Sequence, residues 1–115
     1  MTDAPATDAR IVFVTAPDAE TAERLVTAAV EQRLAACGNI VPGVVSLYRW
    51  NGVVQRDAEV LVLLKTTAAR VEALTARIAA LHPYEVPEVL SVGVDAGLPA
   101  YLAWVAGSTA EVEEE

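Results

Sequence analysis

Apolar residues near the start of this chain follow first a strand pattern and then a helix pattern. Ile11 to Val14 is a short continuous apolar run, which predicts a strand buried on both faces. After it, apolar residues recur every three or four positions, which predicts an amphipathic helix with Asp18 as its N-cap. The positions that share the apolar face of this helix are Ala22, Leu25, Val26, Ala29, Val30 and Leu34.

Two long runs in the middle of the chain predict a β-hairpin. Residues 39–50 and 53–65 form its strands, and Asn51-Gly52 between them is a dipeptide favoured by two-residue type I′ turns. At roughly 3.3 Å per residue, each strand could reach about 40 Å, more than a domain of this size can cover with its own sheet. Pro42-Gly43 predicts a bulge that bends the hairpin away from that sheet. The apolar overhang is expected to pair with another subunit.

The second half of the chain predicts a helix, a strand and a third helix. The inner face of the second helix is formed by Val71, Leu74, Ile78 and Leu81. Residues 86–94 predict a fourth strand, and Pro99 suits the first turn of a third helix that Gly107 closes. The order is βαββαβ plus a terminal helix. The predicted fold class is therefore α+β, a ferredoxin-like sandwich with a long hairpin between its second and third strands.

The segment His82–Glu88 has a composition that core packing does not explain. It contains the only histidine of the chain, two prolines, a tyrosine and two glutamates. Pro83 cannot continue the preceding helix and biases His82 toward extended geometry, and Pro87 adds a second constraint. The segment is expected to hold its polar side chains in fixed positions. A helix stop followed by an edge strand would also account for the prolines.

This heptapeptide resembles the signature of the CutA family, the divalent-cation tolerance proteins, and other blocks resemble that family in the same order and spacing. Those blocks are Arg33–Ile40, Pro42–Val44, Ser46–Gly52, Leu64–Thr66 and Tyr101–Trp104. The resemblance covers about residues 10–108 and rests on several distinct motifs. Two departures occur. Gly38 stands where a larger apolar residue is expected, and Val53-Val54 stands where charged residues are expected.

The resemblance implies a fold, an assembly and a function. CutA proteins are similar in architecture to PII signalling proteins, with three subunits around a threefold axis. The chain is accordingly expected to be a non-enzymatic homotrimer involved in the response to metal ions, binding copper or other divalent cations weakly and needing no obligatory cofactor. The alternative is a PII-like sensor that binds a small anionic metabolite in clefts between subunits.

Composition narrows the partners of the chain. A formal net charge of -8 argues against nucleic acid, because phosphate backbones need clustered Lys and Arg. No apolar run reaches the roughly 18 residues of a membrane span. The hydrophobic fraction of 54% is high for 115 residues, which favours an oligomer interface.

Boundaries and location follow from the ends of the chain and from its cysteine. Residues 1–9 are expected to form a disordered tail without a signal sequence, residues 10–108 one domain, and residues 109–115 an acidic tail. Cys37 is the only cysteine, so no internal disulfide can form. A cytoplasmic protein is expected.

Three side chains are candidate metal ligands. His82 and Cys37 are the borderline and soft ligands, and Glu85 is a hard one beside His82. One chain lacks the roughly four Cys or His ligands of a closed zinc site, although a trimer could bring three copies together. The alternatives remain open: Cys37 as a small buried hydrophobe, and His82 as a helix-end histidine that contacts carbonyl groups.

A second group of residues predicts a ligand cleft and an interface. Lys65 is the only lysine, and the cleft is expected to contain Lys65, Glu59, Tyr84, Glu85 and Glu88. A strand-end lysine that reaches solvent is the alternative. The aromatic residues expected at the trimer interface are Tyr48, Trp50, Tyr101 and Trp104. Catalysis by Cys37 with His82 as base is not expected, since no third orienting group is identifiable.

Overall fold

The computed structural model describes residues 6–111. The elements along the chain are β1 (Ala9–Ala16), α1 (Ala19–Glu31), β2 (Cys37–Trp50), β3 (Val53–Thr67), a 3-10 turn (Ala68–Arg70), α2 (Val71–Leu81), β4 (Val89–Gly93) and α3 (Pro99–Ser108). This order confirms the predicted α+β ferredoxin-like fold with a long hairpin and an added C-terminal helix. None of the helices in the described part of the chain is long and apolar enough to cross a membrane.

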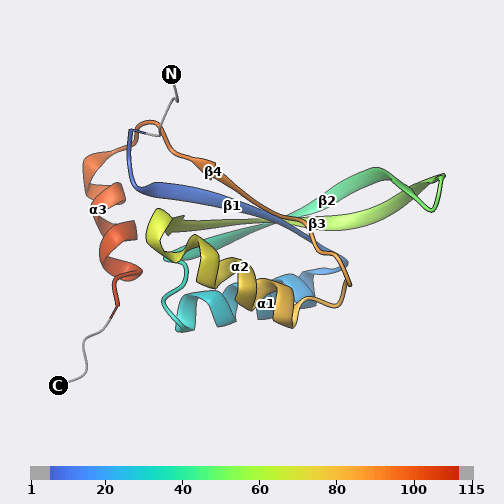
Figure 1. The fold of residues 1–115 in the computed structure, drawn as a ribbon, viewed down its shortest axis with the longest axis horizontal. Coiled ribbons are helices and arrows are strands. Elements are labelled where there is room, and N and C mark those ends of the chain that lie inside the picture. The colour runs from blue at the N-terminus through green and yellow to red at the C-terminus, as the bar shows by residue number, and fades with distance from the viewer. Residues whose placement is uncertain (1–5, 112–115) are drawn as a thin grey trace.

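The four strands form one antiparallel sheet in the order β2-β3-β1-β4, and helices α1 and α2 cover one of its faces (Figure 1). Val12 and Val14 of β1 point into this helix-covered core and are fully buried. Ile11 and Phe13 alternate with them and are only half-buried. The prediction that this strand is buried on both faces was therefore wrong for the single chain. A continuous apolar run indicates that both faces of a strand avoid water. It does not indicate what covers the face opposite the helices.

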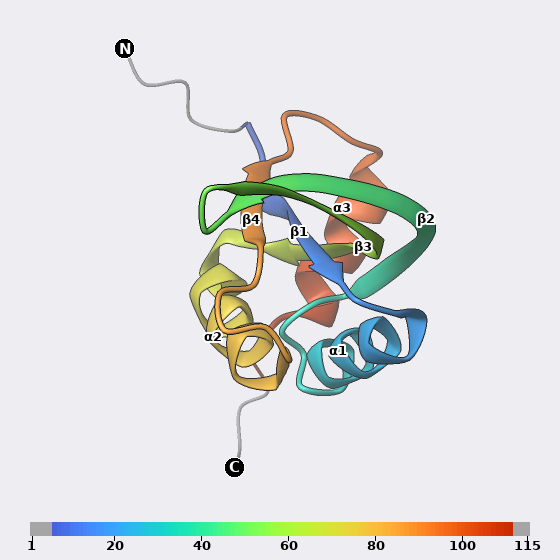
Figure 2. The same cartoon turned by 90° about the vertical axis from the view of Figure 1, so that its right-hand side faces the viewer.

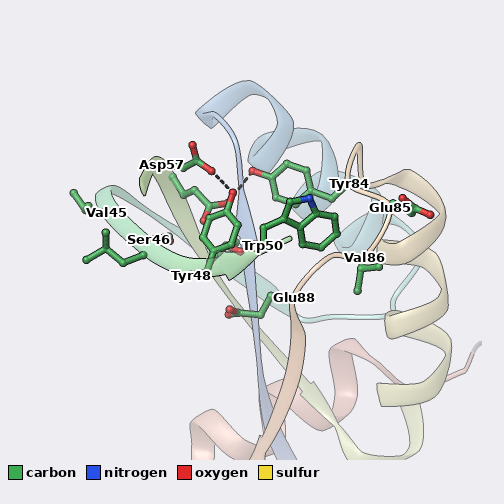
Figure 3. A pocket seen from close by; sticks show the side chains of 12 residues that line it. Val45, Ser46, Tyr48, Trp50, Asp57, Tyr84, Glu85, Val86 and Glu88 are labelled. Atoms are coloured by element: carbon green, nitrogen blue, oxygen red, sulfur yellow. Dashed lines mark hydrogen bonds between the residues drawn. The ribbon is translucent and has the colours of Figure 1, made fainter. Parts of the chain in front are cut away.

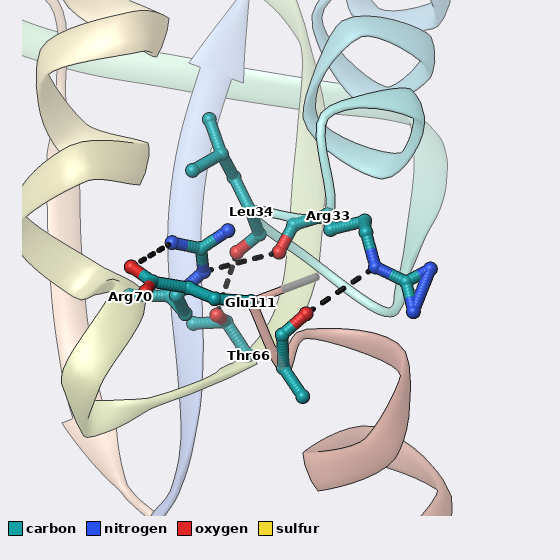
Figure 4. Close-up of polar contacts among 6 residues, drawn as sticks. Arg33, Leu34, Thr66, Arg70 and Glu111 are labelled. Carbon is teal, nitrogen blue, oxygen red and sulfur yellow. Dashed lines mark hydrogen bonds and ion pairs between the residues drawn. The ribbon is translucent and has the colours of Figure 1, made fainter. Parts of the chain in front are cut away.

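Helix α1 begins where the sequence predicts. The Asp18 carboxylate accepts a hydrogen bond of 2.7 Å from the Thr21 backbone N–H, which caps the helix. Thr66, at the far end of β3, donates its buried hydroxyl to the Leu34 carbonyl at 2.6 Å and fixes the chain just after α1 (Figure 4). The helix layer is thus bonded to the sheet at this end.

Both ends of the fold extend beyond the predicted domain boundaries. Ala9 is already buried in β1, and the Thr7 hydroxyl donates to the Val94 carbonyl at 2.7 Å. Thr109 is buried and its hydroxyl donates to the Val105 carbonyl, and Glu111 lies 3.4 Å from the Arg70 guanidinium. Residues near positions 9 and 109 are therefore ordered, because they satisfy backbone groups of the core. The rest of the two predicted tails, residues 1–5 and 112–115, lies outside the described residues.

The hairpin projects away from the helix layer (Figures 1 and 2). Asn51 and Gly52 have φ angles of 50° and 77°, as a type I′ turn requires at both central positions. The predicted bulge is confirmed, because the pairing with β3 shifts between Val41 and Val44 where Gly43 has a φ of 80°. The predicted overhang is thus present in the single chain.

Two boundaries in the second half differ from prediction. Strand β4 begins at Val89 and not at residue 86. Pro87 has no backbone N–H to donate to a neighbouring strand, and the backbone bends at residues 83–86. Helix α3 continues through Gly107 to Ser108, so the glycine does not end it.

Candidate functional site

An open cleft of about 750 Å³ lies between the projecting hairpin and the segment that follows α2 (Figure 3). Its acidic and aromatic lining consists of Tyr48, Trp50, Asp57, Glu59, Tyr84, Glu85 and Glu88. The first four come from β2 and β3, and the others from the connection between α2 and β4. The cleft is therefore built where two segments distant in sequence meet.

His82 holds the connection in place. Its side chain is 7% exposed, and its Nε2 lies 2.7 Å from the Thr15 carbonyl oxygen at the end of β1. Its Nδ1 accepts the Tyr84 backbone N–H at 3.1 Å. Because a backbone N–H only donates, Nδ1 is the acceptor and Nε2 carries the proton given to Thr15. Both ring nitrogens are occupied, so His82 has no lone pair left for a metal ion.

Tyr84 connects the same segment to the hairpin. Its hydroxyl donates to Glu59 Oε2 at 2.8 Å, and Glu59 is only 8% exposed. Its ring lies 4.6 Å from the His82 ring, measured between centroids. Desolvation and then the hydrogen bond to Glu59 raise the pKa of Tyr84 far above its ordinary value, so the phenol remains a donor.

A second tyrosine repeats this arrangement nearer the tip of the hairpin. The Tyr48 hydroxyl donates to Asp57 Oδ2 (Figure 3). That hydrogen bond is the main cause that raises the pKa of Tyr48. Two of the carboxylates in the cleft are thus oriented by phenol groups that stay protonated.

The lining of the cleft is strongly acidic. It contains four carboxylates, from Asp57, Glu59, Glu85 and Glu88, and no Lys, Arg or His. Like charges gathered around a cleft create a negative potential that attracts cations and repels anions. Within this chain the cleft is suited to a cationic group.

Comparison with known proteins identifies the family. The CutA1 divalent ion tolerance protein family matches residues 10–108. The chain belongs to this family. A divalent-cation tolerance protein CutA of Thermus thermophilus is 46% identical over 99 residues, which cover 86% of this chain and 96% of that protein. Protein CutA of mouse is 46% identical over 93 residues, covering 81% of this chain and 52% of the mouse protein, so the chain spans about half the length of that relative.

Solved structures of CutA proteins have the same fold. The crystal structure of CutA from Xylella fastidiosa superposes with a TM-score of 0.89 at 42% identity, covering 90% of this chain and all of that one. The divalent cation tolerance protein of Thermus thermophilus gives a TM-score of 0.87 at 45% identity, covering 89% of this chain and 99% of that one.

Only part of the predicted ligand cleft is assembled in the single chain. Glu59, Tyr84, Glu85 and Glu88 line the same cleft, whereas Lys65 does not. Lys65 lies six residues beyond Glu59 on β3, which is about 20 Å along a strand, and is paired opposite Ile11 of β1. Within residues 6–111 it forms no ion pair.

The three predicted metal ligands of this CutA chain do not converge. Cys37 stands opposite Lys65 in the sheet, near one end of β1, whereas His82 contacts Thr15 near the other end. The Cys37 sulfur lies 3.4 Å from the Tyr101 hydroxyl, and this contact raises the pKa of Tyr101. Among residues 6–111 no group of three Cys, His, Asp or Glu side chains could hold a metal ion.

The aromatic residues predicted at a subunit interface are accessible in the single chain. Their exposed fractions are 41% for Tyr48, 53% for Trp50, 43% for Tyr101 and 48% for Trp104. Tyr48 and Trp50 line the cleft, while Tyr101 and Trp104 pack against each other on α3 with centroids 5.5 Å apart.

Sequence reasoning missed Asp57 as a residue of the cleft. The signal was available, because the Asn51-Gly52 turn fixes the hairpin register. Counting back from the turn pairs Tyr48 with Gln55 and Ser46 with Asp57, so Asp57 lies diagonal to Tyr48 on the same face.

Proposed function

We propose that this chain acts in the response to divalent metal ions, copper among them, and binds them weakly without catalysing a reaction. The observation that carries the proposal is the cleft, whose lining includes four carboxylates and three aromatic rings and no basic side chain. Membership of the CutA1 divalent ion tolerance protein family supports the same function.

Weak binding follows from the ligands. Carboxylate oxygens are hard ligands, and the two groups that favour copper most, the imidazole of His82 and the thiol of Cys37, are bonded to Thr15 and Tyr101. We therefore propose that the cleft carboxylates attract the cation in place of the predicted set of His82, Glu85 and Cys37, and that binding is weak because within residues 6–111 no three of them converge into a preformed metal site. Glu85 is retained from that set. Copper(II) should bind more tightly than zinc, in the general order for nitrogen and oxygen ligands.

We further propose that the functional unit is a homotrimer. The hairpin exposes large apolar side chains in the single chain, including Leu47 at 67% and Val54 at 63%. The sheet face opposite the helices exposes Leu90 and Val92 as well. An isolated protein with this much apolar surface would tend to associate. The trimer is expected from the resemblance to CutA proteins.

A role without catalysis agrees with the positions of the reactive groups. Cys37 and His82 lie near opposite ends of β1, so they do not form a nucleophile and base pair. The loop after β1 is unsuited to an anion, because the negatively charged Asp18 carboxylate lies at the start of α1 and accepts the Thr21 backbone N–H. The predicted cytoplasmic location stays a prediction.

The second candidate is a PII-like sensor of a small metabolite. The cleft volume of about 750 Å³ lies in the range of small-molecule sites, which favours this candidate. An anionic ligand would need cations that the lining of one chain lacks. Lys65 of a neighbouring subunit is the candidate to supply one, and the Lys65→Met variant tests it.

Calorimetry with copper(II) and zinc distinguishes the two candidates. Glu59→Gln and Glu88→Gln should each weaken copper binding several-fold, and Glu72→Gln, an exposed glutamate on α2 outside the cleft, should leave it unchanged. Loss of copper binding in Cys37→Ser, with both cleft variants unaffected, would overturn the assignment. If no divalent ion bound and an anionic metabolite did so in a Lys65-dependent way, the sensor would be the function.

A further inference from the structure

Arg77 of α2 has a buried donor without a partner. Its Nε is the one buried side-chain nitrogen or oxygen in residues 6–111 that lacks a hydrogen bond. A guanidinium stays protonated in proteins, so this N–H is always a donor. A buried donor without an acceptor is costly, and such groups in native proteins call for an unseen partner.

Arg77 also lines a small groove. It has a volume of about 140 Å³ and lies between α1 and α2, lined by Thr21, Arg24, Leu25, Ala28, Arg77 and Leu81. That volume is several times the roughly 30 Å³ that one water occupies. The groove can therefore hold a polyatomic ion and not only a single water.

Three side chains with donor groups line the groove. Arg77 comes from α2, and Arg24 comes from α1. Thr21 is 5% exposed, and its hydroxyl accepts a long contact of 3.4 Å from Arg24 Nη2, which leaves its own proton available to donate. Two guanidinium groups and a hydroxyl are the donor types that recognise oxyanions.

Neither arginine forms an ion pair within residues 6–111, although the charge of Arg24 contributes to lowering the pKa of Asp18 at the start of α1. The positions three and four residues from Arg77 on α2 are Ala73, Leu74, Ala80 and Leu81, which are all apolar. Arg24 has Glu20 four residues before it, yet the ion pair formed within residues 6–111 is that of Arg70 with Glu111. The chain has 16 acidic and 8 basic residues, so two arginines that line one groove without an ion pair among residues 6–111 are unexpected unless a ligand uses them.

We propose that the groove between α1 and α2 binds a small phosphate-type oxyanion, held by Arg24 and Arg77 with the Thr21 hydroxyl. This site lies on the helix layer and is separate from the acidic cleft. It adds an anion site to a protein proposed to bind cations elsewhere.

The Arg77 Nε–H signal in a proton–nitrogen NMR spectrum tests the proposal directly. Arg77→Lys identifies the signal by removing it. Inorganic phosphate is added to the full chain while chloride is withdrawn, so that the ionic strength stays constant. The Nε–H signal should shift, and the shift should saturate at millimolar phosphate. Acetate is titrated in parallel to test a carboxylate ligand. It should bind more weakly than phosphate, because it carries less charge and fewer acceptor oxygens.

A matched pair of variants locates the site. Arg24→Gln should weaken phosphate binding about tenfold, since it removes a charged hydrogen bond. Arg33→Gln removes the same charge at an exposed position beyond the C-terminal end of α1, does not line the groove, and should leave the affinity unchanged. A signal that shifts without saturating, or equally in all variants, would show ionic screening only and overturn the proposal.

Two further outcomes would also overturn it. An Nε–H signal insensitive to phosphate would mean that water occupies the groove. Phosphate binding that appears only after Glu113, Glu114 and Glu115 are changed to Gln would mean that the acidic end of the chain is the natural occupant.

Discussion

Tyr84 donates its hydroxyl to Glu59 across 2.8 Å, and this hydrogen bond joins the segment after α2 to strand β3. The two residues are 25 positions apart in sequence. The bond satisfies a buried carboxylate and at the same time forms one wall of the acidic cleft. Stability and the shape of the cleft are therefore coupled at this contact.

Removing the Tyr84 hydroxyl should destabilise the protein. Tyr84→Phe leaves the ring in place but takes the donor from a carboxylate that is 8% exposed, so the free energy of unfolding should fall by about 1–2 kcal/mol. Guanidinium denaturation measures it. Combining this change with Glu59→Gln should cost less than the sum of the two single changes, because the two side chains share one interaction. Full additivity would contradict the contact.

Alkaline pH should weaken the fold. The pKa values of three tyrosines are raised. The hydrogen bond to Asp57 raises that of Tyr48, desolvation raises that of Tyr84, and the contact with Cys37 raises that of Tyr101. A tyrosine whose folded pKa exceeds the unfolded value near 10 contributes stability below about pH 10 and loses it as pH rises toward the folded value. The free energy of unfolding should thus decline above about pH 10.

Tyrosinate absorbance and denaturation measure this effect together. Little tyrosinate should form at about pH 10 in the folded protein, whereas the unfolded chain is half ionised there. The decline in stability should be shallower in Tyr84→Phe, which lacks the group with the largest shift. Ordinary titration of all three tyrosines in the folded protein would contradict this prediction.

His82 is expected to matter for stability more than for metal binding. His82→Ala removes the contacts to the Thr15 carbonyl and to the Tyr84 N–H, and should lower the free energy of unfolding by about 1–3 kcal/mol. Calorimetry on the folded variant should show copper affinity reduced by less than about threefold, because the wild-type ring offers no lone pair. A loss of copper binding without loss of stability would reverse this assignment.

Gly38 is predicted to tolerate no side chain. A Cβ there would lie 2.7 Å from Val26 Cγ1 and 2.9 Å from Leu64 Cδ2, so Gly38→Ala should destabilise the protein by about 1–3 kcal/mol. Thermal or chemical denaturation measures it. Gly107→Ala is the control, since a Cβ meets nothing within 4 Å there and alanine favours helix. Val26→Ala should relieve part of the cost when combined with Gly38→Ala, and an unrelieved double variant would argue against this clash.

Assembly should depend on Trp50. The side chain is 53% exposed on the hairpin of the single chain, and a charge placed there would be costly to bury between subunits. Trp50→Asp should convert a trimer to smaller species in light scattering at micromolar concentration. Thr27→Asp, at an exposed position on α1, should leave the trimer intact. A wild-type mass of one chain, 12.1 kDa, would refute the trimer itself.

The sequence determined most of the local structure, because local rules govern it. Asp18 caps α1, Asn51 and Gly52 form a turn with two positive φ angles, and Gly43 marks a bulge. Each of these depends on backbone geometry that a few neighbouring residues specify. The blocks that resemble CutA likewise identified the family before the fold was known.

Only the tertiary structure decided the roles of the candidate site residues. The sequence offered His82 as a ligand or as a helix-end residue, and the choice depended on Thr15, which is 67 positions away. The sequence grouped Lys65 with the cleft carboxylates. Strand β3, however, places Lys65 about 20 Å from Glu59, which lines the cleft. Composition specifies which groups are available. Which of them meet is set by sheet register and packing between distant segments, and in a proposed trimer by neighbouring subunits as well.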